Sequence, residues 1–412
     1  MTVPSNDRQT SESVTLFERL WSLAGMFLKL GSIGFGGPQA HIAMINNEAV
    51  VRRNWMTQQQ FTEGLAVCQM LPGPASTQMG IYTGYIRAGQ LGALVAGLCF
   101  IAPAFLIVVA LSWGYFQFQG VPQIEALFLG ISPIVTAIVL GFCWKLARKT
   151  LSTRAGWAIS IVVFLLMWFA NVNVLILFLL AGAFGLYLYA PQKPNAAWLA
   201  PTLPTVWGTA NNSNALQTLV SESFWGWERI AIFGLPLVWF FVKVGSLIFG
   251  GGLVIIPLIE FEVVDRLQWL TREEFINGVA IGQLSPGPVV LTAAFVGYKV
   301  SGFLGALAAS VGVFFPSFAF IMLAMPFWLR LRENPWIQAF LKGVTPAVLG
   351  AIAAAAIPLA EASLTQDTIW KSVLAGCIGI AAMVALLRFK VATWQLIVAG
   401  AAVGLLVGWI QP

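Results

Sequence analysis

Twelve apolar stretches, most of them about as long as a membrane-spanning helix, dominate this 412-residue chain. A helix needs about 20 apolar residues to cross the hydrocarbon core of a bilayer. The stretches lie near residues 20–45, 61–85, 90–114, 124–144, 155–172, 174–190, 230–256, 275–298, 303–327, 337–360, 371–387 and 392–411. The sequence therefore predicts an all-α polytopic membrane protein whose surroundings are a lipid bilayer.

The composition excludes the other broad classes of protein. Charged residues make up 9% of the chain and apolar residues 58%, whereas soluble globular proteins carry about 25% charged residues. Such hydrophobicity also excludes intrinsic disorder. The four cysteines are spread thinly through apolar runs, which is not the pattern of a disulfide scaffold. The first twenty residues are polar and lack the apolar region of a cleaved signal peptide.

No motif in the sequence indicates a cofactor. A single histidine cannot supply a tetrahedral metal site, and the cysteines lack CxxC spacing. A Walker A motif is absent, so direct use of ATP is not expected. We therefore expect no metal, no cofactor and no nucleic-acid partner, and a membrane enzyme or redox protein is the weakest functional class.

The chain contains an internal repeat. FLKLGSIGFGG at 27–37 reappears as FVKVGSLIFGG at 241–251, and 20 of the 46 residue pairs between 29–74 and 243–288 are identical. Shared apolar composition does not align glycines, prolines and charged residues in this way, so the sequence indicates a tandem duplication. We expect four segments: a polar N-terminal segment 1–19, a first repeat 20–190, a polar linker 191–229 and a second repeat 230–412.

The 22 basic residues help to decide how the two repeats are oriented, because lysine and arginine favour the cytoplasmic side. If all six stretches of each repeat cross the membrane, the repeats are parallel, with eleven basic residues inside and eight outside. If 61–85 and 275–298 enter and leave on the same side, each repeat has five spans plus one re-entrant hairpin, and the repeats are inverted. The split is then thirteen to six, with Arg19 outside, which favours an inverted repeat.

A Pro-Gly-Pro sequence lies in the middle of both stretches that we interpret as re-entrant hairpins. Pro72-Gly73-Pro74 and Pro286-Gly287-Pro288 each remove two backbone donors and exclude a regular helix. Non-helical backbone at membrane depth is tolerated only inside protein or beside an aqueous cavity. Two breaks at repeat-related positions therefore indicate the substrate site of a transporter.

The residues near these breaks are hydrogen-bond donors, and a broken helix also directs a positive helix end into the gap. They predict an oxyanion site between the repeats, with one lysine and one hairpin tip from each. The candidate substrate-binding residues are Lys29, Ser32, Gly36, Gly37, Gln69, Pro72, Gly73, Pro74, Thr77 and Gln78 in the first repeat, and Lys243, Ser246, Gly250, Gly251, Gln283, Ser285, Pro286, Gly287, Pro288 and Thr292 in the second.

Structural explanations compete with these assignments. Either lysine can snorkel toward the membrane surface, and the glycines can serve close helix packing. His41, Glu48 and Glu262 are candidates for proton coupling. His41 can equally be a structural imidazole, and each glutamate lies four residues before an arginine, a spacing that also suits a helical salt bridge.

The motifs resemble those of the chromate ion transporters, in their long two-domain bacterial form. The matching residues are Gly34-Phe35-Gly36-Gly37-Pro38-Gln39-Ala40-His41 and Leu71-Pro72-Gly73-Pro74-Ala75-Ser76-Thr77-Gln78, with Phe249-Gly250-Gly251-Gly252 and Ser285-Pro286-Gly287-Pro288 in the second repeat. The second repeat departs from the pattern at Gly252 and Ile255, where the first has Pro38 and His41. Any family role of that proline and histidine is therefore expected in the first repeat only.

The resemblance implies a multi-pass protein of the bacterial inner membrane that moves chromate, usually outward and coupled to the proton-motive force as in an antiporter, and so gives chromate resistance. Sulfate, a tetrahedral dianion of similar size, is the natural competitor. An uncoupled anion channel with the same donors is the alternative of a different class, and the sequence leaves a homodimer open.

Overall fold

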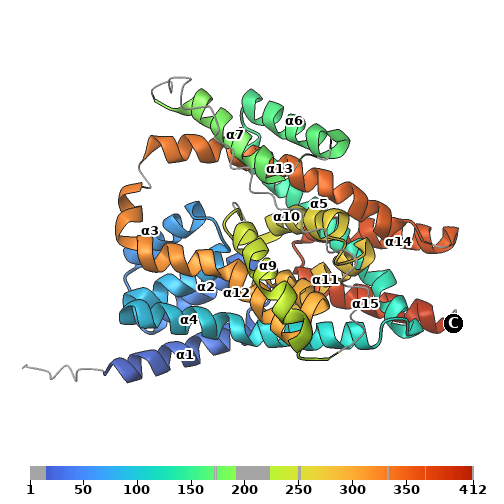
Figure 1. Ribbon diagram of the computed structural model, residues 1–412, viewed down its shortest axis with the longest axis horizontal. Helices are drawn as coiled ribbons and strands as arrows, with labels where there is room; N and C mark the ends of the chain where they lie inside the picture. The colour runs from blue at the N-terminus through green and yellow to red at the C-terminus, as the bar shows by residue number, and fades with distance from the viewer. Residues whose placement is uncertain are drawn as a thin grey trace, which may run out of the picture.

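The computed structural model describes residues 15–170, 172, 174–191, 223–248, 252–331, 334–366 and 368–410, and its regular elements over these residues are all helical (Figure 1). Most of the linker expected at 191–229 lies outside the described residues. The helices of the first half are α1 (Leu16–Ile33), α2 (Gly37–Asn46), η1 (Asn47–Arg52), α3 (Gln58–Met70), α4 (Ala75–Gln117), α5 (Pro122–Thr150), α6 (Arg154–Ala170) and α7 (Val174–Tyr189). Those of the second half are α9 (Trp227–Gly245), η3 (Gly252–Val254), α10 (Ile255–Glu260), η4 (Phe261–Arg266), α11 (Arg272–Leu284), η5 (Val289–Leu291), α12 (Thr292–Leu331), α13 (Pro335–Leu364), α14 (Ile369–Val384), η6 (Ala385–Phe389) and α15 (Thr393–Ile410).

The local structure repeats at the spacing found in the sequence. The π-helices η1 and η4 begin 214 residues apart, and a non-glycine residue with positive φ follows each of them, Asn54 and Gln268. A capping box then starts the next helix, from Thr57 in α3 and Thr271 in α11. A side-chain oxygen that accepts from the free N–H groups of a first turn fixes where a helix begins. Equivalent residues therefore build equivalent elements in the two halves.

The first apolar stretch of each half differs from our expectation of a single span. Residues 20–45 form two helices, because Gly36 and Gly37 adopt positive φ between α1 and α2. The chain also reverses there: Lys29 Nζ lies 3.9 Å from Glu48 Oε1, whereas 19 residues of straight helix would separate them by about 28 Å. Residues 230–256 are likewise divided, since α9 ends at Gly245 and α10 begins at Ile255.

Each long helix that follows a Pro-Gly-Pro sequence contains a sharp kink. The kink of α4 is at Ala88 and Gly89, and that of α12 is at Ser301 and Gly302. Gly89 and Gly302 have φ of 62° and 57°, a region that glycine enters without steric cost. The kinks separate the short helix that follows each break from the long helix beyond it.

The long helices α4 and α12 pack against each other in opposite directions (Figure 1). Phe105 of α4 contacts Phe303 of α12 with their ring centroids 5.9 Å apart, while the more N-terminal Gly97 lies against Phe318. Moving forward along α4 therefore means moving backward along α12. Since Pro103 and Pro316 are equivalent in the repeat, α4 and α12 are equivalent helices that lie antiparallel.

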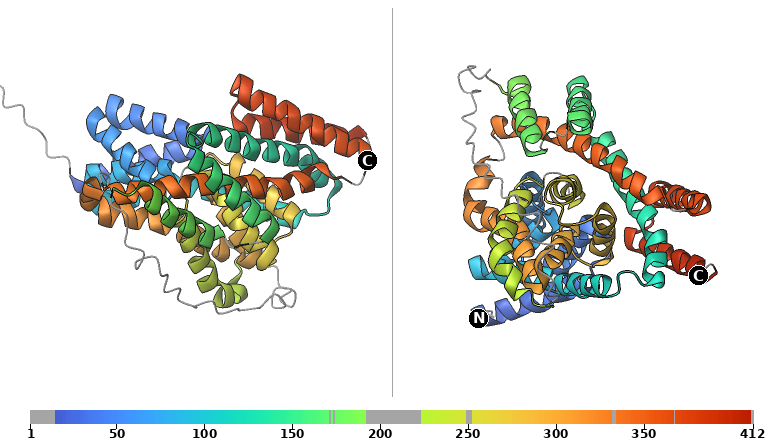
Figure 2. Two further views of the ribbon diagram at one scale, coloured as in Figure 1. Left: turned by 90° about the horizontal axis from the view of Figure 1, so that it is seen from above. Right: turned by 45° about the vertical axis from the view of Figure 1, so that its right-hand side comes forward.

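The remaining long helices flank this centre. In the right-hand view of Figure 2, α5, α13, α14 and α15 border one side of the bundle formed by the first helices of both halves. Close contacts at small residues hold them together, such as Gly130 on Gly400 and Gly350 on Ser160. Large apolar side chains such as Leu235 and Trp409 remain exposed, as lipid contact requires.

Ten spans were expected, and fewer helices of the described residues combine the required length with an apolar sequence. Among the described residues, five helices are long and apolar enough to cross a membrane, and three shorter ones are also apolar. The five are Ala75–Gln117, Pro122–Arg148, Val289–Leu323, Pro335–Leu364 and Ile369–Phe389.

Candidate functional site

The two Pro-Gly-Pro sequences interrupt helices in the protein interior. α3 ends at Met70 and α4 begins at Ala75, so Pro72-Gly73-Pro74 is non-helical, and Pro286-Gly287-Pro288 lies likewise after the end of α11. All six residues are buried. Gly73 has φ of 129°, which a side chain would strain. Both helix breaks are therefore enclosed by protein.

Each break contacts the glycine-rich segment of the opposite half. The N–H of Gly73 donates to the carbonyl of Ile248 at 2.8 Å, just before the glycines of the second half. In the other direction, Nε2 of His41 contacts the carbonyl of Pro286 at 3.1 Å and that of Gly34 as well. Since both partners are acceptors, this nitrogen carries the proton and donates. His41, predicted as a coupling residue, thus connects the glycine-rich segment of the first half to the second break.

The glycines of the breaks also pack against the long helices of the opposite half. A Cβ added to Gly73 would lie 2.3 Å from Oγ of Ser317 in α12, and one added to Gly287 would lie 2.3 Å from Cβ of Ala104 in α4. Ala104 and Ser317 are equivalent positions, each following a proline of its long helix. The lack of a side chain at each break therefore allows the two halves to interlock.

Several buried polar atoms next to the first break have no hydrogen-bond partner within the described part of the chain. They are Oγ of Ser76, Oγ1 of Thr77, Oε1 of Gln78 and Oγ of Ser317. Ser76 and Thr77 belong to the first turn of α4, which Pro74 leaves without a side-chain cap. The N–H groups of a first turn have no partner inside the helix, and the helix dipole places partial positive charge there. Hydroxyl groups without partners therefore lie beside the first-turn N–H groups at the start of α4.

The second break is chemically different. The residues after Pro288 are Val289, Val290 and Leu291, which carry no polar side chain. The hydroxyls of Ser285 and Thr292 donate to the carbonyls of Gly282 and Val289 at 2.8 and 2.9 Å. Nε2 of Gln283 is buried without a partner among the described residues. The residues that follow the break are therefore polar in the first half and apolar in the second, while the predicted contribution of both repeats to an oxyanion site stays a prediction.

The predicted lysines lie beside the predicted glutamates. Glu48, which is 8% exposed, accepts from Arg52 at 2.8 Å and from Arg53 at 3.3 Å, and Lys29 completes the cluster. The hydrogen bond from Arg52 is the main reason that the pKa of Glu48 is below its ordinary value. Glu48 is therefore ionised at neutral pH, which fits an ion-pair role better than proton transfer.

The second half repeats this arrangement. Glu262 accepts from Arg266 at 3.1 and 3.2 Å, and Lys243 lines a small cavity with Glu262. Both glutamates lie in π-helices, which are rare and often mark functional sites. These π-helices were not predicted, because no residue pattern distinguishes a π-helix from an ordinary helical turn.

The other predicted substrate-binding residues have varied positions. The hydroxyls of Ser32 and Ser246 donate to the carbonyls four residues earlier, each at 2.8 Å. Gln69 is exposed, while Nε2 of Gln78 donates to the Pro72 carbonyl at 2.7 Å and closes the first break. Gly250 and Gly251 lie outside the described residues.

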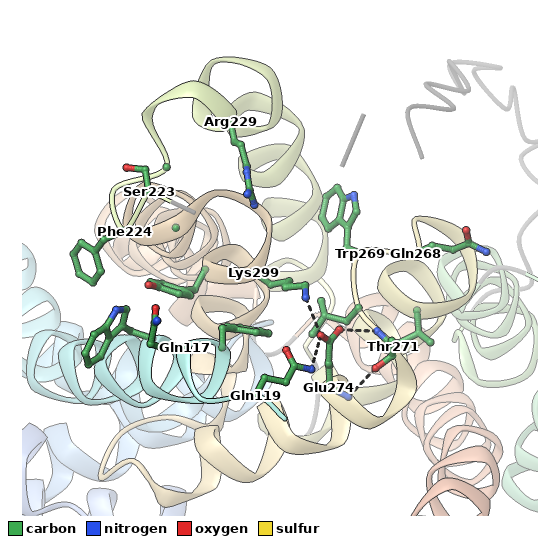
Figure 3. Close-up of a pocket in the computed structure, with 17 residues that line it drawn as sticks. Gln117, Gln119, Ser223, Phe224, Arg229, Gln268, Trp269, Thr271, Glu274 and Lys299 are labelled. Carbon is green, nitrogen blue, oxygen red and sulfur yellow. Dashed lines mark hydrogen bonds and ion pairs between the residues drawn. The ribbon is translucent and has the colours of Figure 1, made fainter. Parts of the chain in front are cut away.

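Sequence reasoning missed a cavity of about 670 Å³ beside the kink of α12. Its lining includes Gln119 and Lys299, which both bind Glu274, at 3.2 and 2.8 Å, and Arg229 extends from α9 toward the same space (Figure 3). These residues come from four separate segments of the chain, so no local sequence motif predicts the cavity.

A second cavity, of about 510 Å³, lies between η4 and the helices α6 and α13. Glu260, Asp265, Arg266 and Arg272 supply its charged residues. Glu260 is 3% exposed, and both its carboxylate oxygens lack a hydrogen bond within the described residues. Its counterpart in the first repeat is the neutral Asn46, so the repeat comparison gave no reason to select it.

The chain is similar to known proteins over most of its length. The model of the chromate transporter family matches residues 21–186 and 235–405. The chromate transport protein of Cupriavidus metallidurans is 34% identical over 389 residues, which cover 93% of this chain and 92% of that protein. A probable chromate transport protein of Synechococcus elongatus is 34% identical, covering 84% of this chain and 86% of that protein. An uncharacterized transporter of Methanocaldococcus jannaschii is 28% identical, covering 81% and 83%. No solved structure matches the chain.

These relatives are named as transport proteins, and the family match extends through both halves of the chain. The long apolar helices make the chain a multi-pass membrane protein. The resemblance noted from the two glycine-rich segments and the two Pro-Gly-Pro sequences is confirmed. The chain belongs to the chromate transporter family.

Proposed function

We propose that this protein is a secondary transporter that carries chromate outward across the bacterial inner membrane, driven by the proton-motive force, and so gives chromate resistance. One structural observation carries the proposal: buried donors of Ser76, Thr77 and Ser317 lack partners in the described structure where the two halves meet. An unpaired buried hydroxyl costs free energy unless something binds it. A tetrahedral dianion suits these donors and the N-terminus of α4.

The proposed transport mechanism is alternating access around the two breaks. The repeats 20–190 and 230–412 are proposed to be inverted in the membrane, as the antiparallel contact between α4 and α12 supports. The kink of α4 lies near its N-terminal end, at Gly89. The kink of α12 lies near the C-terminal end of α4, because Gly302 and Gln117 line the same cavity. The two kinks are therefore near opposite ends of α4. Movement of one interlocked half against the other would then expose the breaks to each side in turn.

The basic residues suggest which end faces the cytoplasm. Arg53 and Arg87 both lie over the ring of Trp55, and Arg19 is close enough for its charge to act on Arg87. The split of basic residues placed Arg19 outside, but Arg19 lies near residues that were counted as cytoplasmic. We therefore reassign Arg19 to the same side as Arg53 and Arg87. By the preference of basic residues for the cytoplasmic side, we assign this end to the cytoplasm.

Lys29 and Lys243 remain part of the proposed site. Lys29 has a side chain that is 58% exposed, so its ammonium group is accessible to an approaching anion. Its ion pair with Glu48, at 3.9 Å, is weak, so a bound anion can replace it. We propose that each lysine attracts the dianion toward the breaks and returns to its glutamate when the anion leaves.

Chromate flux into inverted membrane vesicles tests the proposal. A carrier should saturate with chromate concentration and respond to an imposed pH gradient. A flux that rises linearly and ignores the gradient would support the alternative of an anion channel. Sulfate added at the same concentration as chromate separates a chromate carrier from a general oxyanion carrier, since only the general carrier is then strongly inhibited. Vesicles without the protein are the control.

A further inference from the structure

The charged cavity between η4 and the helices α6 and α13 is not explained by the helix breaks. Arg266 and Arg272 line it together with Glu260 and Asp265, and its volume of about 510 Å³ has room for an oxyanion with several waters, since a water occupies about 30 Å³. Its other walls are apolar or small: Met167, Trp168, Phe261, Ala354, Ala355 and Pro358. Within the described lining, α6 and α13 therefore bring no charged group to face Glu260.

Arg272 is shared unequally between two carboxylates. Its Nη2 donates to Asp265 at 2.8 Å, while its Nε approaches Glu260 only to 3.6 Å. Asp265 is half exposed and Glu260 is buried. The better bond thus goes to the carboxylate that water can also solvate, and Glu260 is left with an ion-pair contact but no hydrogen bond among the described residues.

Burial of this carboxylate favours its protonated form more than exposure to water would. Burial raises the pKa of Glu260 well above its ordinary value, and the charge of Arg272 offsets this only in part. Asp265 raises it further through its negative charge. Glu260 is therefore a candidate proton-binding group that contacts Arg272 and shares its cavity with Arg266.

The first half has uncharged residues at the positions equivalent to Glu260 and Arg272. Glu260 and Arg272 correspond to Asn46 and Gln58 in the repeat, and Nδ2 of Asn46 donates to Oε1 of Gln58 at 3.2 Å. The same two positions therefore meet in both halves, as a neutral amide pair in one and an ion pair in the other. Since the amide pair fits the fold, the charges of the second half are not needed to hold these segments together.

We propose that this cavity is a second oxyanion-binding site, in which Arg266 and Arg272 hold a tetrahedral dianion and Glu260 accepts a proton when the anion binds. The inference rests on the proposed function, because it takes chromate as the anion. Protonation removes one negative charge from the cavity and frees Arg272 from its contact with Glu260. Binding of the proton and of the anion therefore strengthen one another, and this linkage is reciprocal.

Calorimetric titration of the purified protein with chromate at pH 7.5, in two buffers of different ionisation enthalpy, measures both affinity and proton uptake. The wild-type protein should take up as much as one proton per chromate bound. Glu260→Gln should bind chromate at least as tightly as the wild-type protein does. The only protons taken up should be those that chromate itself binds. Proton uptake in Glu260→Gln equal to that of the wild type, or loss of its chromate binding, would overturn the inference.

The double variant Glu260→Asn/Arg272→Gln replaces the ion pair with the amide pair found at the equivalent positions of the first half. We expect it to keep the fold, because the first half accommodates that amide pair. It should bind chromate about tenfold or more weakly, because a charge-assisted hydrogen bond is lost. Affinity equal to that of the wild type would contradict the inference. If the wild-type protein binds no chromate, the proposed function itself fails; if it binds chromate without taking up protons, only this inference fails.

Discussion

The N–H of Gly73 donates a 2.8 Å hydrogen bond to the carbonyl of Ile248, so the first helix break is bound to the main chain of the opposite half. His41 makes the reciprocal contact with the carbonyl of Pro286. Both contacts end on backbone carbonyls, which leaves the donors of Ser76 and Thr77 unused. The halves are thus joined by main-chain contacts beside a point where polar side chains still lack partners in the described structure.

Gly287→Ala should destabilise the contact between the halves. The new Cβ would lie 2.3 Å from Cβ of Ala104, and overpacking of this kind costs about 1–3 kcal/mol. Thermal unfolding in detergent should show a lower midpoint and chromate flux should fall. Adding Ala104→Gly removes the clash and should restore much of both, which simple loss of a structural glycine would not allow. Gly25→Ala, with nothing within 4 Å of its Cβ, is the control.

Thr77→Val should reduce transport without reducing stability. The Thr77 hydroxyl is buried and unpaired within the described residues, so its removal leaves no protein group without a partner. If it binds the anion, flux should fall about tenfold or more, as for the loss of one hydrogen bond to a charged group. Thr83→Val is the matched control on the same helix, because that hydroxyl already donates to the Met79 carbonyl at 2.8 Å. Full flux in Thr77→Val would exclude this residue from the site.

The sequence predicted the helix breaks because the effect of proline is local. Two prolines around a glycine exclude a regular helix, and α3 and α11 end just before Pro72 and Pro286. A single proline, such as Pro103 in α4, is accommodated within a helix. The reversal between α1 and α2 was missed, since hydropathy alone does not distinguish a glycine that packs from one that turns the chain, such as Gly36. The contact between Gly73 and Ile248 was beyond prediction, because no sequence pattern relates positions 175 residues apart that meet only through the fold.

The proposed inversion predicts opposite labelling of two engineered cysteines. Leu151→Cys follows α5 and Thr365→Cys follows α13, and these helices are equivalent in the repeat. In a background without the four native cysteines, an impermeant thiol reagent should label one site in intact cells and the other only in inverted vesicles. Labelling of both from the same side would establish parallel repeats. Retained chromate flux in each variant is the control for correct insertion.

Lys29→Ala and Lys243→Ala should each lower chromate flux at least tenfold while the protein still inserts. For Lys29, a largely exposed side chain with a 3.9 Å ion contact contributes less than about 1 kcal/mol, so the thermal midpoint should hardly change. Glu48 also keeps its hydrogen bonds to Arg52 and Arg53. Lys342→Ala is the control, since this lysine has no counterpart in the first half and should retain flux. Equal flux in all three variants would show that the paired lysines only balance the charge of their glutamates.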